Sequence, residues 1–137
     1  MPRGTLSGQT EVMETGAEAL RCVIVDDNPE FLDTAAKLLG RQGISIVGVA
    51  STSAEALKCV QDHRPDVTIV DIKLGDESGF ELTEQIVRGA VPSPVILTST
   101  HSGNEYSELI AASPALGFVA KEHLSPEEIR RLLDAAC

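Results

Sequence analysis

From Leu20 onward, short apolar runs rich in Val and Ile alternate with longer amphipathic stretches, and this alternation constrains the fold more than any other feature of the chain. Each apolar run has the length of a strand, whereas the amphipathic stretches carry apolar residues at helical spacing. Strands that alternate with helices indicate βα units around a parallel sheet. The sequence therefore predicts an α/β fold built from five βα units, with a single doubly wound, five-stranded parallel sheet.

The predicted strands are nearly continuous apolar segments, which suits strands covered by helices on both faces. They span residues 21–26, 44–49, 66–71, 95–99 and 116–120. The amphipathic stretches between these strands predict five helices, and an N-cap or a proline marks three of their starts. The starts are Pro29, Ser53 as an N-cap, Ser78–Gly79, Asn104 and Ser125-Pro126, and the first helix ends at Gly40 or Gly43.

Residues 1–19 mix Gly, Thr, Ser and Glu without sustained periodicity, so they cannot bury enough apolar surface to fold. We expect a mobile N-terminal tail over residues 1–19 and one domain over residues 20–137. A chain of 137 residues falls in the usual size range of a single domain.

Charge, cysteine content and hydropathy exclude several classes of protein. The formal net charge of −10 disfavours direct contact with nucleic acid, because Lys and Arg drive binding to phosphates. The cysteines are odd in number and lack a Cys-x-x-Cys pair, which argues against a disulfide framework or a thiolate zinc site. No apolar run reaches the ~20 residues of a membrane helix, and no signal peptide is recognisable. We expect a cytoplasmic protein that does not bind a membrane.

Polar residues gather where the predicted strands end. In an open parallel sheet, ligands bind at the carboxyl ends of the strands, beside the point where the strand order reverses. For strand order 2-1-3-4-5, that crevice would bring together five side chains. They are Asp26 and Asp27 after the first strand, Asp71 after the third, a hydroxyl of Thr98-Ser99-Thr100 after the fourth and Lys121 after the fifth.

An aspartate at the end of a strand is most often a turn former or a helix cap, and a lone lysine is most often a solvated charge. Two apolar strands that both end in Asp, with a second Asp beside the first, are less easily explained in this way. Three carboxylates in one crevice repel one another unless a cation neutralises them. Hard oxygen ligands of this kind suit Mg²⁺, so we expect Asp26, Asp27 and Asp71 to bind magnesium.

Four motifs, VIVDDNPEF, IVDIKLGDESG, VILTS and FVAK, occur in this order along the chain. In order and approximate spacing they resemble the receiver domains of two-component response regulators, over residues 20–136. The resemblance implies a flavodoxin-like fold. It also implies that the protein is not an enzyme that turns over a separate substrate, but a phosphoacceptor that catalyses only its own phosphorylation and dephosphorylation.

The resemblance also assigns a role to each residue that matches a motif. Asp71 maps to the phosphoacceptor, Asp26 and Asp27 map to the acidic pair that binds Mg²⁺, and the backbone carbonyl of Lys73 maps to a further metal ligand. Ser99 corresponds to the hydroxyl that reads the phosphate, and Lys121 to the catalytic lysine. Phe118 occupies the aromatic switch position, although it is equally compatible with ordinary core packing.

Two positions depart from the family pattern. Many members have a proline joined by a cis bond after the lysine, whereas Glu122 follows Lys121 here, and a cis bond before a residue other than proline is costly. We therefore expect a differently shaped loop after the fifth strand. The proline usual in the loop after the acceptor is also missing, since the chain reads Leu74-Gly75-Asp76, but Gly79 matches.

Rival interpretations fit less well. A haloacid-dehalogenase-like phosphatase has a DxDx[TV] motif after its first strand, where this chain reads DDNPE. A flavodoxin-like cofactor domain needs a phosphate-binding loop after the first strand, and no Gly-, Ser- or Thr-rich segment follows it. Two alternatives stay open, namely a receiver-like interaction module that is not phosphorylated, and the trimmed receiver of a DNA-binding response regulator.

The expected partner is a sensor histidine kinase that phosphorylates Asp71. Phosphorylation would then change the face formed by the fourth helix, the fifth strand and the fifth helix, where receiver domains commonly form homodimers or bind a partner or output domain. The sequence has no helix-turn-helix after the fifth predicted helix, so we expect no direct contact with nucleic acid.

Overall fold

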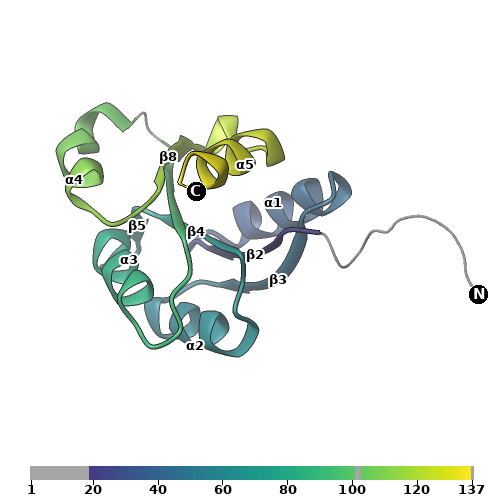
Figure 1. Ribbon diagram of the computed structural model, residues 1–137, viewed down its shortest axis with the longest axis horizontal. Helices are drawn as coiled ribbons and strands as arrows, with labels where there is room; N and C mark the ends of the chain where they lie inside the picture. Colours follow the sequence, from purple (N-terminus) through teal and green to yellow (C-terminus); the bar gives the residue numbers. More distant parts are fainter. Residues whose placement is uncertain (1–18, 101–102, 137) are drawn as a thin grey trace, which may run out of the picture.

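Five parallel strands form the central sheet, in the order β3-β2-β4-β7-β8 (Figure 1). The computed structural model describes residues 19–100 and 103–136. Counted by βα unit, this order is 2-1-3-4-5, so the predicted doubly wound, flavodoxin-like sheet is confirmed. The strands are β2 (Arg21–Val25), β3 (Ser45–Ala50), β4 (Val67–Asp71), β7 (Val95–Ser99) and β8 (Gly117–Ala120).

Alternate side chains of the strands supply two separate apolar cores, one on each face of the sheet. Val23 and Val25 belong to one core, whereas Cys22 and Ile24 belong to the other. All four of these side chains are fully buried, which explains why a strand covered on both faces is apolar at every position.

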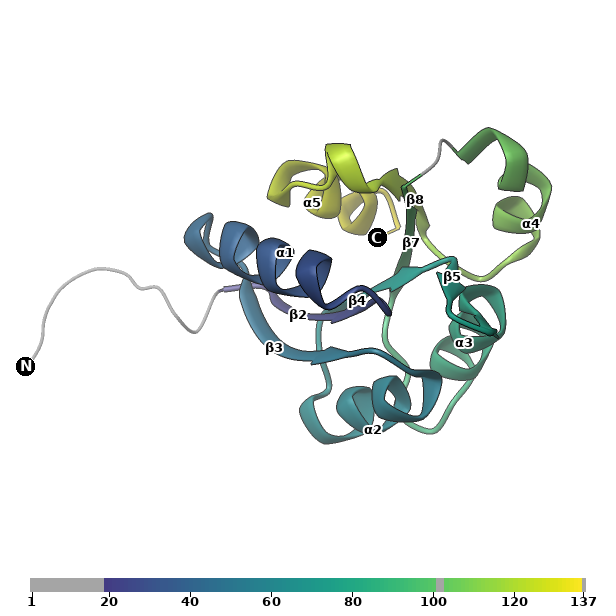
Figure 2. The ribbon, with the colours of Figure 1, turned by 180° about the vertical axis from the view of Figure 1, so that it is seen from behind.

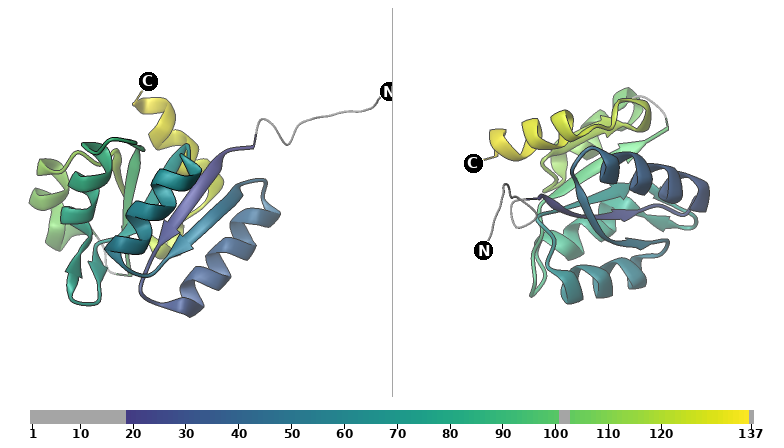
Figure 3. Two further views of the ribbon diagram at one scale, coloured as in Figure 1. Left: turned by 90° about the horizontal axis from the view of Figure 1, so that it is seen from below. Right: turned by 90° about the vertical axis from the view of Figure 1, so that its right-hand side faces the viewer.

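Helices cover both faces in two layers (Figure 2). α1 (Pro29–Arg41) and α5 (Pro126–Ala135) lie together on one face, and α2 (Ser53–His63) and α3 (Gly79–Val87) lie on the other. The short helix α4 (Ser107–Ala112) lies on the same side as α3, beside the edge strand β8 (Figure 3). One-turn 3₁₀ segments, η2 (Gly103–Tyr106) and η3 (Lys121–His123), lie before α4 and after β8.

The structure agrees with most of the predicted helix starts, but two differ. Helix α4 begins at Ser107 rather than near Asn104, because Gly103–Tyr106 form the 3₁₀ turn η2. Ser125 caps α5 as expected, and Ser78, at the predicted start of the third helix, caps α3. Both side chains accept hydrogen bonds from first-turn backbone N–H groups. The expected N-cap of the second helix, Ser53, is wrong: Thr52 is the cap and accepts from the Glu55 backbone N–H. The segment Thr52-x-x-Glu55 has the Thr and Glu spacing of a capping box, which favours this start.

The chain between β4 and α3 also contains an element that the sequence did not predict. Here the short antiparallel strands β5 (Lys73–Leu74) and β6 (Glu77–Ser78) form a hairpin. Gly75 has a φ of 61°, a left-handed conformation that glycine adopts without strain. The first helix runs through Gly40, and Gly43, with a φ of 95°, follows its end.

β3 forms one edge of the sheet and pairs irregularly with β2. Cys22 pairs with Ile46 and Val23 pairs with Gly48, so Val47 has no partner on β2. This arrangement is a β-bulge, with one extra residue on the edge strand.

Candidate functional site

A cleft of about 300 Å³ opens at the carboxyl ends of the strands, where the strand order reverses between β2 and β4. The polar side chains expected from the sequence meet there, although they come from segments far apart in the chain. The lining residues include Asp26, Asp27, Asp71, Ser99 and Lys121, together with Lys73.

Asp26 and Asp27 follow β2 directly and differ in exposure. Asp26 is fully buried, and its Oδ1 accepts a hydrogen bond of 2.9 Å from the backbone N–H of Asn28. The side chain of Asn28 in turn caps α1 by accepting from the Glu30 and Phe31 backbone. The cap fixes the turn after β2, so Asp26 is held in place while Asp27 is exposed in the cleft.

Asp71 is the last residue of β4 and is 7% exposed. Its Oδ1 accepts a 3.3 Å hydrogen bond from the Lys73 backbone N–H. Gly79, the first residue of α3, packs directly against the Asp71 backbone and donates a 2.7 Å hydrogen bond to the Ile72 carbonyl. A Cβ on Gly79 would overlap the Asp71 carbonyl oxygen, so the absence of a side chain there lets α3 approach the end of β4.

Lys121 extends from the end of β8 between two carboxylates. Its Nζ lies 2.5 Å from Oδ2 of Asp26 and 3.3 Å from Oδ2 of Asp71. The same ammonium lies 4.4 Å from the centre of the Phe31 ring, in cation–π geometry. Two opposite charges and an aromatic face therefore hold this lysine in the cleft.

The environment shifts the protonation of Asp71 and Lys121. Burial, and next the negative charge of Asp26, raise the pKa of Asp71 to about 6, although the Lys121 ammonium acts in the opposite direction. Burial lowers the pKa of Lys121, but the hydrogen bonds and charges of Asp26 and Asp71 outweigh it, so the pKa is raised above its ordinary value. The lysine is thus charged at neutral pH, whereas Asp71 ionises at a cost.

The three aspartates have the geometry of a site for a divalent cation. Within the described residues, one carboxylate oxygen from each of Asp26, Asp27 and Asp71 lies within 4.8 Å of the other two. The Oδ2 atom of Asp26 is buried beside the Lys121 ammonium. A buried carboxylate within reach of two more carboxylates fits a hard cation such as Mg²⁺.

The residues at the ends of β7 and β8 have distinct surroundings. The Thr98 hydroxyl donates a 2.7 Å hydrogen bond to the Val119 carbonyl and so points toward β8. Ser99 is 5% exposed and lines the cleft, whereas its neighbour Thr98 does not. Phe118 is half-buried on β8 and packs against the core on the α3 side of the sheet. That position is compatible with core packing and with a switch.

The family model described as the response regulator receiver domain matches residues 22–134. The chain belongs to this family. Among curated proteins, this receiver domain is 28% identical over 120 residues to the "Probable transcriptional regulatory protein NarL" of Mycobacterium tuberculosis, covering 87% of this chain and 56% of the relative. It is 30% identical to the heme response regulator HssR of Staphylococcus saprophyticus, covering 82% and 47% of the two chains. The receiver domain thus spans about half the length of these relatives.

Solved receiver domains have the same fold as this one. The signal receiver domain of NarL from Mycobacterium tuberculosis has a TM-score of 0.74 and 28% identity, covering 87% of this chain and 97% of that structure. The response regulator domain of CheB from Thermotoga maritima has a TM-score of 0.72 and 25% identity, with coverage of 86% and 96%. In the part of this receiver domain that the structure describes, no helix is long and apolar enough to cross a bilayer.

Sequence reasoning missed three residues that shape the cleft of this receiver domain. Asn28 lines it and fixes Asp26, and Gly75 at the tip of the β5–β6 hairpin lies beside Asp27. Phe31 lies in the first turn of α1, and its ring faces Lys121. The polar signal of Asn28 was visible directly after the acidic pair, whereas nothing in the local sequence links Phe31 to a lysine 90 positions later.

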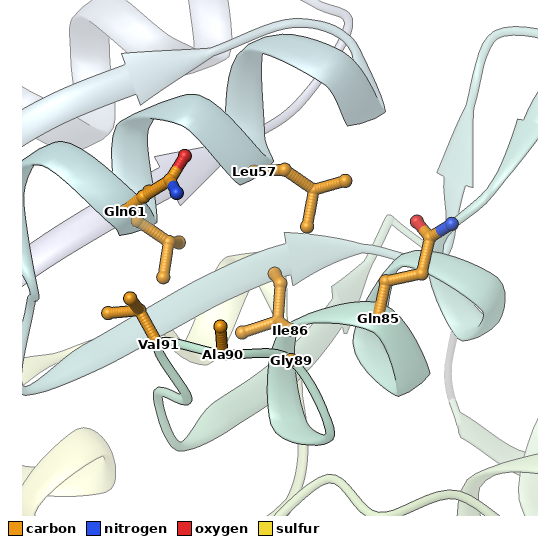
Figure 4. Close-up of a pocket in the computed structure, with 8 residues that line it drawn as sticks. Leu57, Gln61, Gln85, Ile86, Gly89, Ala90 and Val91 are labelled. Carbon is orange, nitrogen blue, oxygen red and sulfur yellow. The ribbon is translucent and has the colours of Figure 1, made fainter.

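A second cavity, of about 170 Å³, lies between α2 and α3 and the loop that follows α3 (Figure 4). Its lining includes the apolar side chains of Leu57, Ile86 and Val91, with the amides of Gln61 and Gln85 nearby. None of its lining residues is ionisable, so this cavity does not share the chemistry of the acidic cleft.

Proposed function

We propose that this receiver domain accepts a phosphoryl group on Asp71 from a sensor histidine kinase, in a reaction that depends on Mg²⁺. The arrangement of Asp71 beside Lys121, with two more carboxylates within reach of one cation, is the observation that carries the proposal. Like response regulators in general, the protein is proposed to act in the cytoplasm, and to catalyse only its own phosphorylation and dephosphorylation.

Each residue of the cleft has its own role in the proposed phosphoryl transfer. An Oδ atom of Asp71 forms a bond to phosphorus while the bond from phosphorus to the donor's leaving group breaks. The Lys121 ammonium, already 3.3 Å from Oδ2 of Asp71, offsets the negative charge of the phosphoryl oxygens. Asp26, Asp27, Asp71 and the Lys73 carbonyl would hold Mg²⁺, which would neutralise a further part of that charge when bound.

The signal would leave the cleft through Ser99 and Phe118. In this proposal the Ser99 hydroxyl donates a hydrogen bond to the phosphoryl group, and the segment after β7 follows it inward. Phe118 then turns into the space released, and the face of α4, β8 and α5 changes shape as the population shifts between two states. That face would form a homodimer or bind an output partner.

Incubation with acetyl phosphate and Mg²⁺ tests the first step. Intact-mass spectrometry should show one added phosphoryl group on the wild type and none on Asp71→Asn, because the amide lacks the nucleophilic oxyanion. Asp76→Asn is a matched control, since Asp76 is exposed on the neighbouring hairpin and should not alter labelling. Equal labelling of wild type and Asp71→Asn would place the acceptor elsewhere. No labelling of the wild type, with or without Mg²⁺, would favour an interaction module that is not phosphorylated.

The second step is tested with beryllofluoride, which mimics the acyl phosphate. Amide shifts in the loaded wild type should be largest over α4, β8 and α5. Ser99→Ala should reduce these shifts while leaving the labelling of Asp71 largely intact. Shifts confined to the acidic cleft would leave Phe118 as an ordinary core residue.

A further inference from the structure

A groove runs between α3 and α4. Two adjoining cavities form it, one of about 320 Å³ beside the β5–β6 hairpin and one of about 220 Å³ toward the end of α4. Phe80 and Leu109 line both cavities, so the two form one continuous groove.

The middle of the groove is apolar. The rings of Phe80 and Tyr106 lie 6.2 Å apart at an angle of 52°, and Leu109 lies beside Phe80. Leu109 is 54% exposed and is one of the few large apolar side chains with so much exposed surface in the described residues. An exposed apolar strip bounded by polar residues is typical of a protein-binding surface.

Acidic side chains line the hairpin and α3 sides of this apolar strip. Asp76 and Glu77 line it at the hairpin end, and Glu81 and Glu84 line it along α3. On the α4 side Glu105 and Glu108 are exposed. The two cavities include a single basic side chain, Lys73, and Arg88 beyond their end is paired with Glu84 at 2.7 Å. The lining of the groove therefore carries an excess of negative charge along α3 and the hairpin.

Helix α4 itself is loosely held. It has no buried residue, and no side chain caps its N-terminus. In addition, α3 packs more closely against α2 than against α4. An element with so little buried surface opens easily and gains stability when a partner covers it.

We propose that the α3–α4 groove binds a short basic amphipathic helix of a partner protein. Two apolar anchors of that helix would lie over Phe80 and Leu109, and its Lys and Arg residues would flank them against the acidic sides. α3 has nine residues and is therefore about 14 Å long, which matches two to three turns of a bound helix.

The negative charge of the groove favours a basic partner over a second copy of this chain, nucleic acid or an anionic membrane. A second copy of this chain would bring the same acidic sides together in a symmetric dimer, and like charges in contact oppose binding. Nucleic acid and anionic membranes are repelled for the same reason. A basic helix is complementary both to the apolar strip and to the acids.

The groove also adjoins the acidic cleft. Lys73 and Gly75 line both, because the β5–β6 hairpin separates the two. A helix bound in the groove would therefore contact the hairpin that follows Asp71. Binding itself needs neither metal nor phosphate, so its test is independent of the proposed phosphorylation.

The probe is a 12-residue peptide of Lys, Ala and Leu with one Trp, arranged so that Trp and Leu share one helical face. The protein contains no tryptophan, so the peptide's own fluorescence reports binding. We expect saturable binding of the peptide, with a blue shift of the Trp emission and an affinity that falls as salt is raised. A peptide with Glu in place of Lys should not bind.

Two charge-matched variants locate the site. Leu109→Lys should weaken binding by at least about tenfold, because it removes an apolar anchor and adds a positive charge that repels the lysines of the peptide. Leu38→Lys introduces the same charge at a residue that is 46% exposed on α1, and should change the affinity by less than about twofold. Both residues are exposed, so both variants should fold like the wild type.

A second pair of variants tests the charge separately from the apolar anchor. Glu81→Gln should weaken binding and flatten its salt dependence, whereas Glu127→Gln on α5 should not. Amide shifts caused by the peptide should fall on α3, α4 and the hairpin. Equal losses for Leu109→Lys and Leu38→Lys, shifts centred on α1 and α5, or the absence of saturable binding would each overturn the proposal.

Discussion

Replacing Asp71 by Asn should stabilise the metal-free protein at neutral pH. Burial and the charge of Asp26 raise the pKa of Asp71 from 3.8 to about 6, so the folded state holds the ionised carboxylate less favourably than the unfolded chain does. A rise of about two pKa units corresponds to about 3 kcal/mol. The carboxylate lines an open cleft, and solvent screening reduces this to roughly 1–2 kcal/mol.

The sign of the pH dependence follows from the direction of the shift. Between pH 4 and 6.5 the folded state binds more protons at Asp71 than the unfolded state does, so this group lowers the free energy of unfolding as the pH rises. The penalty is fully present above the folded pKa. Asn carries no such proton, so the stability difference between Asp71→Asn and the wild type should grow across this window and then level off.

Urea unfolding in a chelating buffer, followed from pH 4 to 8, measures this difference. Asp134→Asn, at an exposed position of α5, should change stability by less than about 0.5 kcal/mol at every pH. Saturating Mg²⁺ should stabilise the wild type and reduce or reverse the difference, because a ligand of the folded state adds to its stability. If the metal-free Asp71→Asn variant is less stable than the wild type at pH 7.5, the ionised Asp71 carboxylate does not destabilise the folded state.

Further outcomes follow from individual contacts. Gly79→Ala should lower the free energy of unfolding by about 1–3 kcal/mol in urea titrations, since a Cβ there meets backbone that cannot move aside. Gly40→Ala should raise the free energy of unfolding by about 0.5–1 kcal/mol, because a Cβ at this helical position meets only open space. Phe31→Leu should slow labelling by acetyl phosphate by roughly threefold to thirtyfold through loss of the ring over Lys121, and Phe31→Tyr should keep the rate. Mg²⁺ affinity, measured by calorimetry, should fall as the pH drops through about 6, because a proton competes for Asp71.

The strands and the place of the cleft follow from local sequence, because buried parallel strands must be apolar throughout and must end at polar residues. The strand from residue 95 to residue 99 was predicted at its observed bounds, and α3 and α5 begin where they were predicted, at Ser78–Gly79 and Ser125-Pro126. Predicting that Asp26, Asp71 and Lys121 meet also required the strand order, which follows from the general rule for open α/β sheets.

What the sequence did not predict depends on contacts or on very short elements. Strands β5 and β6 have two residues each, too few for any alternation to show, and they form because Gly75 allows the chain to reverse. Ser53 and Thr52 are both good caps, and only the folded turn shows that the Thr52 hydroxyl is the one that accepts the backbone N–H of Glu55. The Phe31 ring reaches Lys121 only because α1 lies next to the end of β8.

The bulge at Val47 bears on how the protein behaves at high concentration. An edge strand with an uninterrupted row of N–H and C=O groups is a template on which other chains can pair, and the exposed Val49 would add an apolar contact to such pairing. The extra residue on β3 breaks the regular spacing of that row and increases the local twist. We therefore expect the bulge to protect this edge of the sheet against strand-to-strand aggregation, and deletion of Val47 to promote it.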